Sequence, residues 1–125
     1  MLELVIAMLI FAVLLAIAIP SYRHYVTRTH RADAVRSLLE AANCQERIRA
    51  ETGFYDTSRC VSDLANPRYA FGVEPADEPE SLVFTVIATP REHPGDRCGT
   101  LTLDQAGTRT AGGDGASNAE CWGGR

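Results

Sequence analysis

The sequence predicts an α+β fold, in which one long N-terminal helix packs on a small antiparallel sheet with a disulfide-bounded C-terminal loop. Three observations predict this fold. Residues 4–19 contain no polar side chain. Apolar residues then recur at helical spacing as far as Thr52. Short β-branched and aromatic segments follow, and four cysteines are spread over the second part of the chain.

Length and charge limit the architecture and the partners. The 125 residues suit one domain with an added anchor. The net charge is −4, which argues against nucleic-acid binding, because phosphate contacts need a local excess of positive charge. Nucleic acid is therefore an unlikely but possible partner. The predicted division is a transmembrane helix at 1–21 and a globular head at 22–125, the head comprising an amphipathic helix at 22–52, a loop at 53–67, a sheet at 68–111 and a disulfide-bounded region at 98–121.

The apolar segment is long enough to be a retained membrane anchor. Sixteen residues rise about 24 Å as a helix, and their flanks extend this towards the ~30 Å hydrocarbon core. A signal peptide has a shorter apolar region and a small-residue cleavage site. Here Pro20, Ser21 and Tyr22 follow instead, and the helical pattern continues. We therefore expect the segment to remain in the protein.

Glu3 and Pro20 interrupt the apolar pattern near its two ends. A carboxylate at the start of a bilayer helix costs a few kcal/mol unless it reaches headgroups or a partner. The helix dipole also favours an anion there. Glu3 therefore either extends to the membrane interface or pairs with the α-amine of a neighbouring chain. Pro20 removes a backbone donor and predicts a kink, although a proline is common where a helix leaves a membrane.

The next segment has one apolar face. Gly53 is placed to end the helix in a left-handed cap. The apolar stripe is interpreted as core packing, and it consists of Tyr22, Tyr25, Ala32, Val35, Leu38, Leu39, Ala42 and Ile48.

A loop and several short strands are predicted beyond the helix. Turn-forming residues fill 54–67, and an acidic, proline-rich turn occupies 74–81. Composition and alternation predict strands at 68–73, 82–89, 100–103 and 108–111. The Gly-rich stretch from residue 112 to the C-terminus lacks the apolar residues needed to hold it in place by burial.

The cysteines Cys44, Cys60, Cys98 and Cys121 form an even set without zinc-ligand spacing. Two disulfides, and hence an oxidising compartment, explain them better than buried free thiols do. If Cys98 bonds Cys121, the bridge tethers the C-terminal stretch and restricts the unfolded chain by roughly 3 kcal/mol. Trp122 could then pack on the sheet. A Cys44–Cys60 bridge would pin the loop to the helix.

No catalytic constellation is found in the sequence. It contains no phosphate-binding glycine loop and no nucleophile elbow. The three histidines His24, His30 and His93 lack ligand spacing, and the acids Asp77, Glu78 and Glu80 are interpreted as a solvated turn. We therefore expect no enzyme activity, no catalytic residue, no metal and no cofactor.

The N-terminal region, MLELVIAMLIFAVLLAIAIPSYRHYV, closely resembles that of mature type IV pilins. The matches are Glu3, the apolar run and the AIAIPSY block at 16–22, and the spacing from Glu3 to Pro20 is shared. In the head, the segments RYAF, LVFTVIATP, CGTLTL and ECW look like those of PilE-like minor pilins.

The resemblance implies roles for several of these residues. Glu3 would neutralise the N-terminal amine of an adjacent subunit, Pro20 would correspond to the kink, and Cys98 and Cys121 would bound the exposed loop. Other pilins would contact the N-terminal helix, which would be an inner-membrane anchor before assembly and filament core afterwards. The mature N-terminus, where the family is methylated, aligns just upstream of Met1.

The resemblance also implies a topology, with a single pass and the head in the periplasm, later on an extracellular pilus. The arginines beyond the anchor (Arg23, Arg28 and Arg31) favour a cytoplasmic head by the positive-inside rule. The paired cysteines favour the periplasm, as the family does.

The expected function is a structural subunit of a type IV pilus, a minor pilin in pilus assembly, twitching motility or cell adhesion. One alternative is a DNA-uptake (competence) receptor pilin. Against it, the C-terminal arginines Arg97, Arg109 and Arg125 are balanced by Asp96, Asp104, Asp114 and Glu120. Another alternative is a type II secretion pseudopilin. Pseudopilins usually lack the C-terminal bridge, so a Cys98–Cys121 disulfide would count against it.

Overall fold

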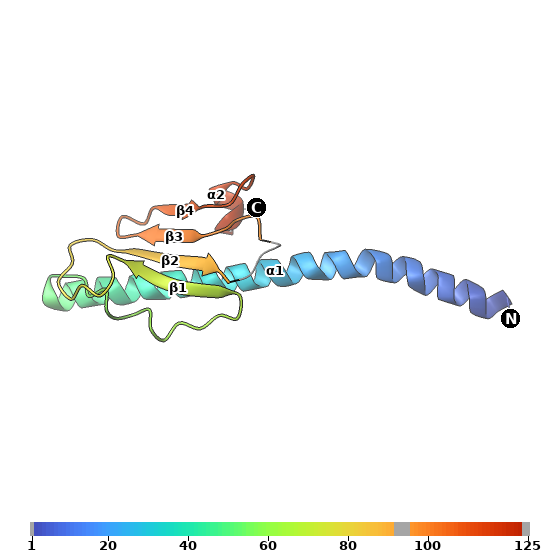
Figure 1. Cartoon of the computed structure of the whole chain (residues 1–125), viewed down its shortest axis with the longest axis horizontal. Coiled ribbons are helices and arrows are strands. Elements are labelled where there is room, and N and C mark those ends of the chain that lie inside the picture. The colour runs from blue at the N-terminus through green and yellow to red at the C-terminus, as the bar shows by residue number, and fades with distance from the viewer. Residues whose placement is uncertain (1, 92–95, 124–125) are drawn as a thin grey trace.

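The computed structural model describes residues 2–91 and 96–123. Its elements are α1 (Leu2–Thr52), β1 (Tyr69–Glu74), β2 (Thr85–Pro90), β3 (Leu101–Asp104), β4 (Arg109–Ala111) and α2 (Asn118–Cys121). The N-terminal half of α1 projects away from the head, which is built on the other half (Figure 1). The predicted α+β fold is confirmed. Met1, His93 and Arg125, considered above, lie outside the described residues.

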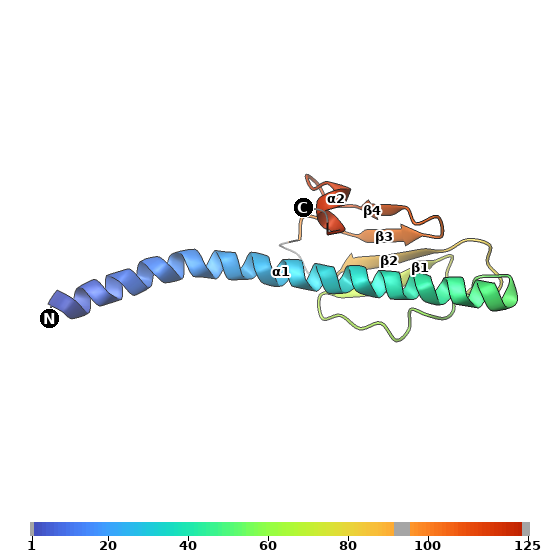
Figure 2. The ribbon, with the colours of Figure 1, turned by 180° about the vertical axis from the view of Figure 1, so that it is seen from behind.

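α1 is 51 residues long and continues through Pro20 as helix. Its N-terminal half curves gradually, which Figure 2 shows from behind. The helix ends as predicted, because Gly53 has a φ of 89° and donates its N–H to the Arg49 carbonyl at 2.8 Å. By length and composition α1 could cross a membrane, and none of its most apolar window is buried.

The core-packed face of α1 differs in part from the predicted stripe. Tyr22 and Tyr25 are 69% and 71% exposed and Ala32 is also exposed, so the assignment of these three residues to the core is wrong. Both tyrosines precede His30, whose carbonyl is bonded by Asn66 of the head, and Ala32 lines a groove at the surface. The side chains that α1 buries are Ala34, Leu38, Ala41, Gln45 and Ile48.

Gln45 is a buried polar residue that the sequence did not single out. Its side-chain amide donates to the carbonyls of Asp56 and Arg59, at 2.7 and 3.1 Å. Its carbonyl accepts the Asp56 N–H at 3.1 Å. All of its polar atoms thus bind the loop after α1, which compensates for their burial.

The four strands form one antiparallel sheet in the order β1-β2-β3-β4. The sequence predicted that this strand begins at Leu82, but β2 begins at Thr85. Residues before Thr85 pair elsewhere: Ser81 forms a bridge with Tyr55, and the Phe84 carbonyl accepts the Gln105 N–H at 3.1 Å. The other predicted strands are correct to within one residue at either end.

One face of the sheet packs on α1 and forms the core. Tyr55 and Phe84 meet edge to face with their ring centroids 4.7 Å apart. Leu38 of α1 and the inward side chains Val86 and Leu101 complete the centre of this cluster. Burying such side chains contributes about 1.5–3 kcal/mol each and is the main stabilisation of the head.

The C-terminal stretch contains a short helix that the sequence analysis missed. The Ser117 hydroxyl accepts the Glu120 N–H at 3.2 Å, and the Glu120 carboxylate accepts the Ser117 N–H at 3.3 Å. These two bonds form a capping box at the start of α2. The Ser-x-x-Glu spacing could have revealed it, but the surrounding glycines suggested an irregular tail.

Two disulfides join distant parts of the head. Cys44 on α1 bonds Cys60 in the following loop, and Cys98 bonds Cys121 at the end of α2. All four cysteines are therefore paired, and the alternative of buried free thiols is not supported. Each bridge closes a loop of moderate length, which restricts the unfolded chain by roughly 3 kcal/mol.

Candidate functional site

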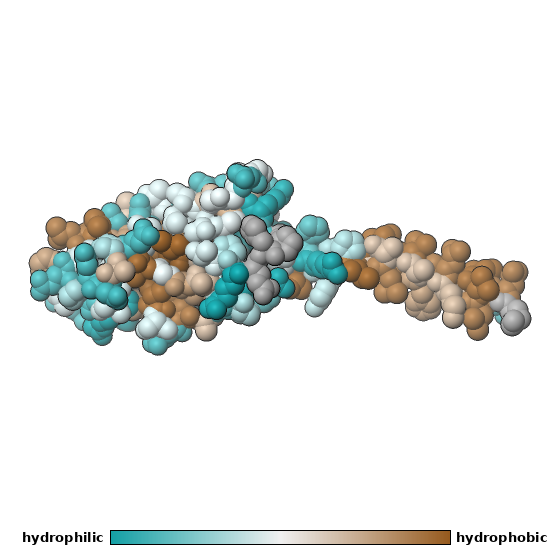
Figure 3. All heavy atoms as spheres, in the orientation of Figure 1, coloured by the Kyte–Doolittle hydropathy of each residue, from teal (hydrophilic) through white to brown (hydrophobic). Residues whose placement is uncertain are grey.

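The first candidate surface is the projecting half of α1. Leu9, Ile10 and Phe11 point in different directions around the helix, and each is more than half exposed. Figure 3 shows hydrophobic residues over most of this surface, with hydrophilic ones where it approaches the head. A helix that is apolar on all sides is stable only in lipid or among other helices. The described head leaves it uncovered, so a membrane or other chains must cover it.

Glu3 and Pro20 both lie on this surface, and the disulfides do not. Glu3 is exposed in the first turn of α1. Among residues 2–91 and 96–123, no ion pair includes it. Cys98 lies beside Arg31, which is 28 residues along α1 from Glu3, and Cys121 is bonded to Cys98. The structure therefore places the predicted assembly residue and the disulfide-bounded loop at separate sites.

A hydrogen-bond network connects α1 to the start of the disulfide-bounded loop. The Arg31 guanidinium donates to Asp96 at 2.6 Å and lies 3.0 Å from the Cys98 sulfur. The other oxygen of Asp96 accepts the Tyr69 hydroxyl proton. Burial raises the pKa of Tyr69, and its bond to Asp96 raises this pKa further. This network fixes the position of the loop against the helix.

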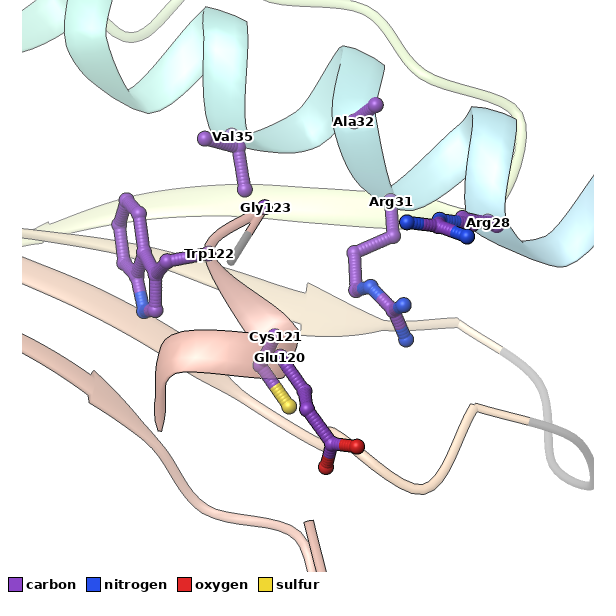
Figure 4. A pocket seen from close by; sticks show the side chains of 8 residues that line it. All are labelled: Arg28, Arg31, Ala32, Val35, Glu120, Cys121, Trp122 and Gly123. Carbon is purple, nitrogen blue, oxygen red and sulfur yellow. The ribbon is translucent and has the colours of Figure 1, made fainter. Parts of the chain in front are cut away.

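A groove lies beside this network, between α1 and the C-terminal end of the chain. It has a volume of about 150 Å³. Ala32 and Val35 of α1 and the indole of Trp122 form its apolar walls, and Arg28 and Arg31 contribute positive charge (Figure 4). Glu120 also lines it. Sequence reasoning did not find this groove, because its walls are almost ninety residues apart in the chain.

Trp122 forms the wall of the groove on the side of the sheet, and its side chain packs against β4. Its indole N–H donates to the Thr110 carbonyl of β4 at 3.0 Å. The Arg109 guanidinium lies over the ring, 5.5 Å from its centroid. The prediction that Trp122 packs on the sheet is confirmed, and the contact gives the groove a rigid aromatic wall.

An exposed apolar patch lies at the other end of the head. Leu82 is 74% exposed, Val83 49% and Phe54 39%. Figure 3 shows hydrophobic atoms at this end, farthest from the anchor. The exposed acids Glu78 and Glu80 precede the patch in the chain. We call this surface the distal patch.

Exposed arginines and acids are spread unevenly over the head. Arg68 and Arg91 are exposed at the end nearest the anchor, where Asn66 bonds the His30 carbonyl at 3.4 Å. Arg97 is exposed near Arg31 and Asp96. The turn between β1 and β2, at the opposite end, carries acids and no arginine, but Arg47 and Arg49 are exposed on the last turns of α1 at that same end. Adding up charges along the sequence did not show this placement.

The described residues contain no metal-binding cluster of three or more histidine, cysteine, aspartate or glutamate side chains. His24 and His30 lie on α1 within the arginine-rich segment, and Asp77, Glu78 and Glu80 lie in an exposed turn. The features that can support a function are therefore the anchor, the groove, the distal patch and the arginines.

Comparisons with known proteins agree on one family. The family model of the type IV minor pilin ComP, DNA uptake sequence receptor, matches residues 20–102. A type IV pilin from Shewanella oneidensis is 32% identical with a TM-score of 0.55, over 72% of this chain and 97% of that chain. The non-core minor pilin PilV of Neisseria meningitidis is 24% identical with a TM-score of 0.57, over 81% and 98%. No curated protein sequence matches significantly.

Proposed function

The chain belongs to the ComP family of type IV minor pilins, and from this premise we propose that it enters the filament by exchanging lipid around α1 for the helices of neighbouring pilins. It is a membrane-anchored pilus component that interacts with other components of the pilus.

The exposed apolar half of α1 is the observation that carries this proposal. Its side chains stay out of water both in a bilayer and in a bundle of like helices, so the exchange costs little hydrophobic free energy. The difference between the two states then rests on the polar groups of the segment. Glu3 is the one charged side chain between residues 2 and 22.

Glu3 would gain a counter-ion only in the filament. In the bilayer its carboxylate must stay near the headgroups, because burial without a partner costs a few kcal/mol. In a bundle of parallel pilins, the α-amine of a neighbour lies at the same end of its helix. Pairing with that amine would favour the assembled state and set the axial position of the subunit. Pro20 would let the helix bend as the head leaves the membrane surface.

The topology proposed is a single pass with the head in the periplasm. Two disulfides in a head of this size support an oxidising compartment. The Cys98–Cys121 bridge also counts against the pseudopilin alternative. Twitching motility, adhesion and N-methylation, which the family resemblance implies, remain predictions for this chain.

Replacement of Glu3 tests the mechanism. We expect Glu3→Ala to remain in the membrane fraction at the wild-type level and to be missing from sheared pili. Glu40→Ala is the matched control, because Glu40 is an exposed acid of α1 outside the anchor. It should enter pili normally. Wild-type amounts of Glu3→Ala in sheared pili would rule out the proposed role of Glu3.

DNA binding is a second candidate function, which the arginines at the anchor end of the head favour. The matching family model is described as a DNA uptake sequence receptor. Arg68 and Arg91 are exposed at that end, and the acid-rich β1–β2 turn lies at the other. A local excess of positive charge on an acidic chain can still bind phosphates.

The DNA proposal is tested with the full chain in detergent micelles and a labelled duplex. We expect a mobility shift that weakens as the salt concentration rises. The double variant Arg68→Glu with Arg91→Glu should lower the slope of the logarithm of the binding constant against the logarithm of the salt concentration by roughly 1.8, because two phosphate contacts are lost. Arg36→Glu with Arg47→Glu is the control, because both arginines are exposed on α1 away from that end. No shift at any salt concentration, or an equal effect of the control, would contradict DNA binding at these arginines.

A further inference from the structure

We propose that Arg23 and Arg28, together with Tyr22 and Tyr25, bind the headgroups of anionic phospholipids around α1 while the chain is in the membrane. We call this segment, residues 22–28, the collar. The inference rests on the anchor in the proposed function and adds to it a lipid contact that is selective for charge. Three features carry it: the charges of the collar, its level on α1, and its distribution around the helix.

The collar is basic, and its arginines have no acidic partner in the described head. Apart from Glu3, the chain has no acidic residue before Asp33. Arg23 and Arg28 are exposed, and neither belongs to an ion pair among residues 2–91 and 96–123. Figure 3 shows that the hydrophobic residues of the anchor give way to hydrophilic ones before the head. The positive charge therefore begins where the apolar surface ends.

Arg28 also lines the groove, but the acids there are paired with other arginines. Asp96 is bonded to Arg31 at 2.6 Å, and Glu120 lies 3.8 Å from Arg97. Arg28 is the residue of the groove nearest to the anchor along α1. Because it is exposed and unpaired among the described ion pairs, its long side chain can turn back along the helix towards a phosphate.

The collar lies at the level of the headgroups. Residues 4–19 fill most of the hydrocarbon core, and the headgroup layer beyond it is roughly 5–8 Å thick. Arg23 lies about 4.5 Å and Arg28 about 12 Å beyond Pro20 along α1. The Cα–Cβ bonds of a helix are tilted towards its N-terminus, so both side chains start back towards the membrane. Arg23 thus lies among the phosphates, and Arg28 lies within a Debye length of them, about 8 Å.

The spacing of Glu3 and Arg23 fits the two surfaces of one bilayer. Twenty residues separate them, which is about 30 Å along the helix and equals the thickness of the hydrocarbon core. With Arg23 among the phosphates of one leaflet, the Glu3 carboxylate reaches the headgroups of the other and avoids the cost of burial. The lipid contact of the collar therefore sets the depth of the anchor before assembly.

The collar faces several sides of α1, as contact with surrounding lipid requires. At about 100° per residue, Arg23 and Arg28 lie about 140° apart around the helix. Tyr22 and Tyr25, which are 69% and 71% exposed, point to the remaining sides. Tyrosine is typical of membrane interfaces, because its ring is apolar and its hydroxyl stays in water. A protein or a DNA duplex would contact one side of the helix, whereas lipid surrounds it.

Quenching by brominated lipids tests the contact with the full chain in vesicles. Tyr22→Trp places an indole in the collar, and Trp122→Phe removes the single native one. Brominated lipids quench an adjacent indole, so brominated phosphatidylglycerol compared with brominated phosphatidylcholine gives the relative association constant of the two lipids. Because an arginine near an anionic surface contributes about fivefold, we expect a preference for phosphatidylglycerol of about threefold or more when averaged over the surrounding lipids. It should weaken as the salt concentration rises.

Replacement of the arginines locates the contact. In the same background, Arg23→Gln with Arg28→Gln should abolish the preference. Arg23→Lys with Arg28→Lys should keep most of it, because lysine binds phosphate as a point charge. Arg36→Gln with Arg47→Gln is the matched control, because it removes the same charge from exposed positions of α1 beyond the collar. An unchanged preference without Arg23 and Arg28, or an equal loss in the control, would overturn the proposal.

The outcomes also separate this inference from the proposals above. If an alkaline wash removes the chain from the vesicles, the anchor fails and not only the lipid contact. If the chain is inserted but shows no preference for phosphatidylglycerol, the collar inference alone fails. If Arg68→Gln with Arg91→Gln removes the preference instead, the lipid contact lies on the head and the collar is the wrong surface. If an added DNA duplex removes the preference, nucleic acid and not lipid is the occupant of the collar.

Discussion

Arg31 of α1 and Asp96, at the start of the disulfide-bounded loop, are joined by a 2.6 Å hydrogen bond in a largely buried ion pair. Their side chains are 16% and 9% exposed. Because Asp96 also accepts the Cys98 N–H at 3.1 Å and the Tyr69 hydroxyl, this pair links the helix, the sheet and the second disulfide. The orientation of the groove therefore depends on it.

We expect Arg31→Ala to lower the free energy of unfolding of the head by about 3 kcal/mol, because it leaves the Asp96 carboxylate buried without its counter-ion. Urea unfolding of residues 26–125, which contain the whole core and both disulfides, measures the loss. Arg36→Ala is the matched control. Arg36 and Glu40 form a 3.0 Å pair with side chains 80% and 56% exposed, so its loss should cost less than about 0.5 kcal/mol. Equal losses would mean that the buried pair contributes no more than a surface pair.

The stability of the head should fall above pH 10. Burial raises the pKa of Tyr69 and of Tyr55, so the native state keeps both protons where the unfolded chain releases them at its ordinary pKa near 10. Unfolding then releases protons, and the free energy of unfolding decreases by up to about 1.4 kcal/mol per pH unit for each tyrosine. Residues 26–125 contain no lysine, no free cysteine and no tyrosine besides these two, so no other side chain of this fragment titrates in this range.

Urea midpoints of the head at pH 9, 10 and 11 check this, with tyrosinate absorbance as a second readout. Tyr69→Phe should lose about half of the pH dependence between pH 10 and 11, because Tyr55 remains. A urea midpoint that is independent of pH, or tyrosinate that forms at pH 10 while the head is still folded, would contradict the predicted loss of stability.

The two disulfides should differ in their effect on Trp122, the single tryptophan. Replacing Cys98 and Cys121 by alanine frees the end of α2, so the emission of Trp122 should shift to the red under native conditions. Replacing Cys44 and Cys60 should leave the emission unchanged, although both double variants lose roughly 3 kcal/mol of stability. Fluorescence spectra before and during urea unfolding separate the two effects. A red shift of similar size in both would show that the C-terminal bridge does not hold Trp122 in particular.

How much of the molecule the sequence predicted depends on the range of the interactions. α1, its end at Gly53 and the four strands follow from local periodicity and turn chemistry, and they were predicted to within a few residues. The core assignment of Tyr22, Tyr25 and Ala32 was wrong, because periodicity shows which face of a helix is apolar and not where the tertiary contacts begin. The β2 start was misplaced because Ser81 pairs with Tyr55, a partner far away in the chain.

The candidate site shows the same limit. Glu3 and Pro20 stand out in an apolar run, so the sequence alone drew attention to them. Arg28 and Trp122 both line the groove, and nothing in either segment of the sequence indicates the other. The α2 capping box was readable from Ser117 and Glu120, but the glycines around it pointed to an irregular tail.

Gly113 makes a very close backbone contact with the segment that contains Arg97 and Cys98. A Cβ atom at this position would lie 1.9 Å from the Arg97 carbonyl oxygen and 2.6 Å from the Cys98 carbonyl carbon. Both are backbone atoms of a segment that the Cys98 disulfide and Asp96 hold in place, so they cannot move aside cheaply. Gly113→Ala should therefore lower the free energy of unfolding by about 3 kcal/mol, the upper end of the range for overpacking, and should break the 3.0 Å bond from the Gly113 N–H to the Cys98 carbonyl.

Gly72→Ala is the control, because a Cβ atom there meets nothing within 4 Å, and alanine in a strand should stabilise the head by about 0.5 kcal/mol. Urea unfolding followed by Trp122 emission measures both variants, and a Gly113→Ala midpoint equal to that of the wild type would show that the loop can open at this point without loss.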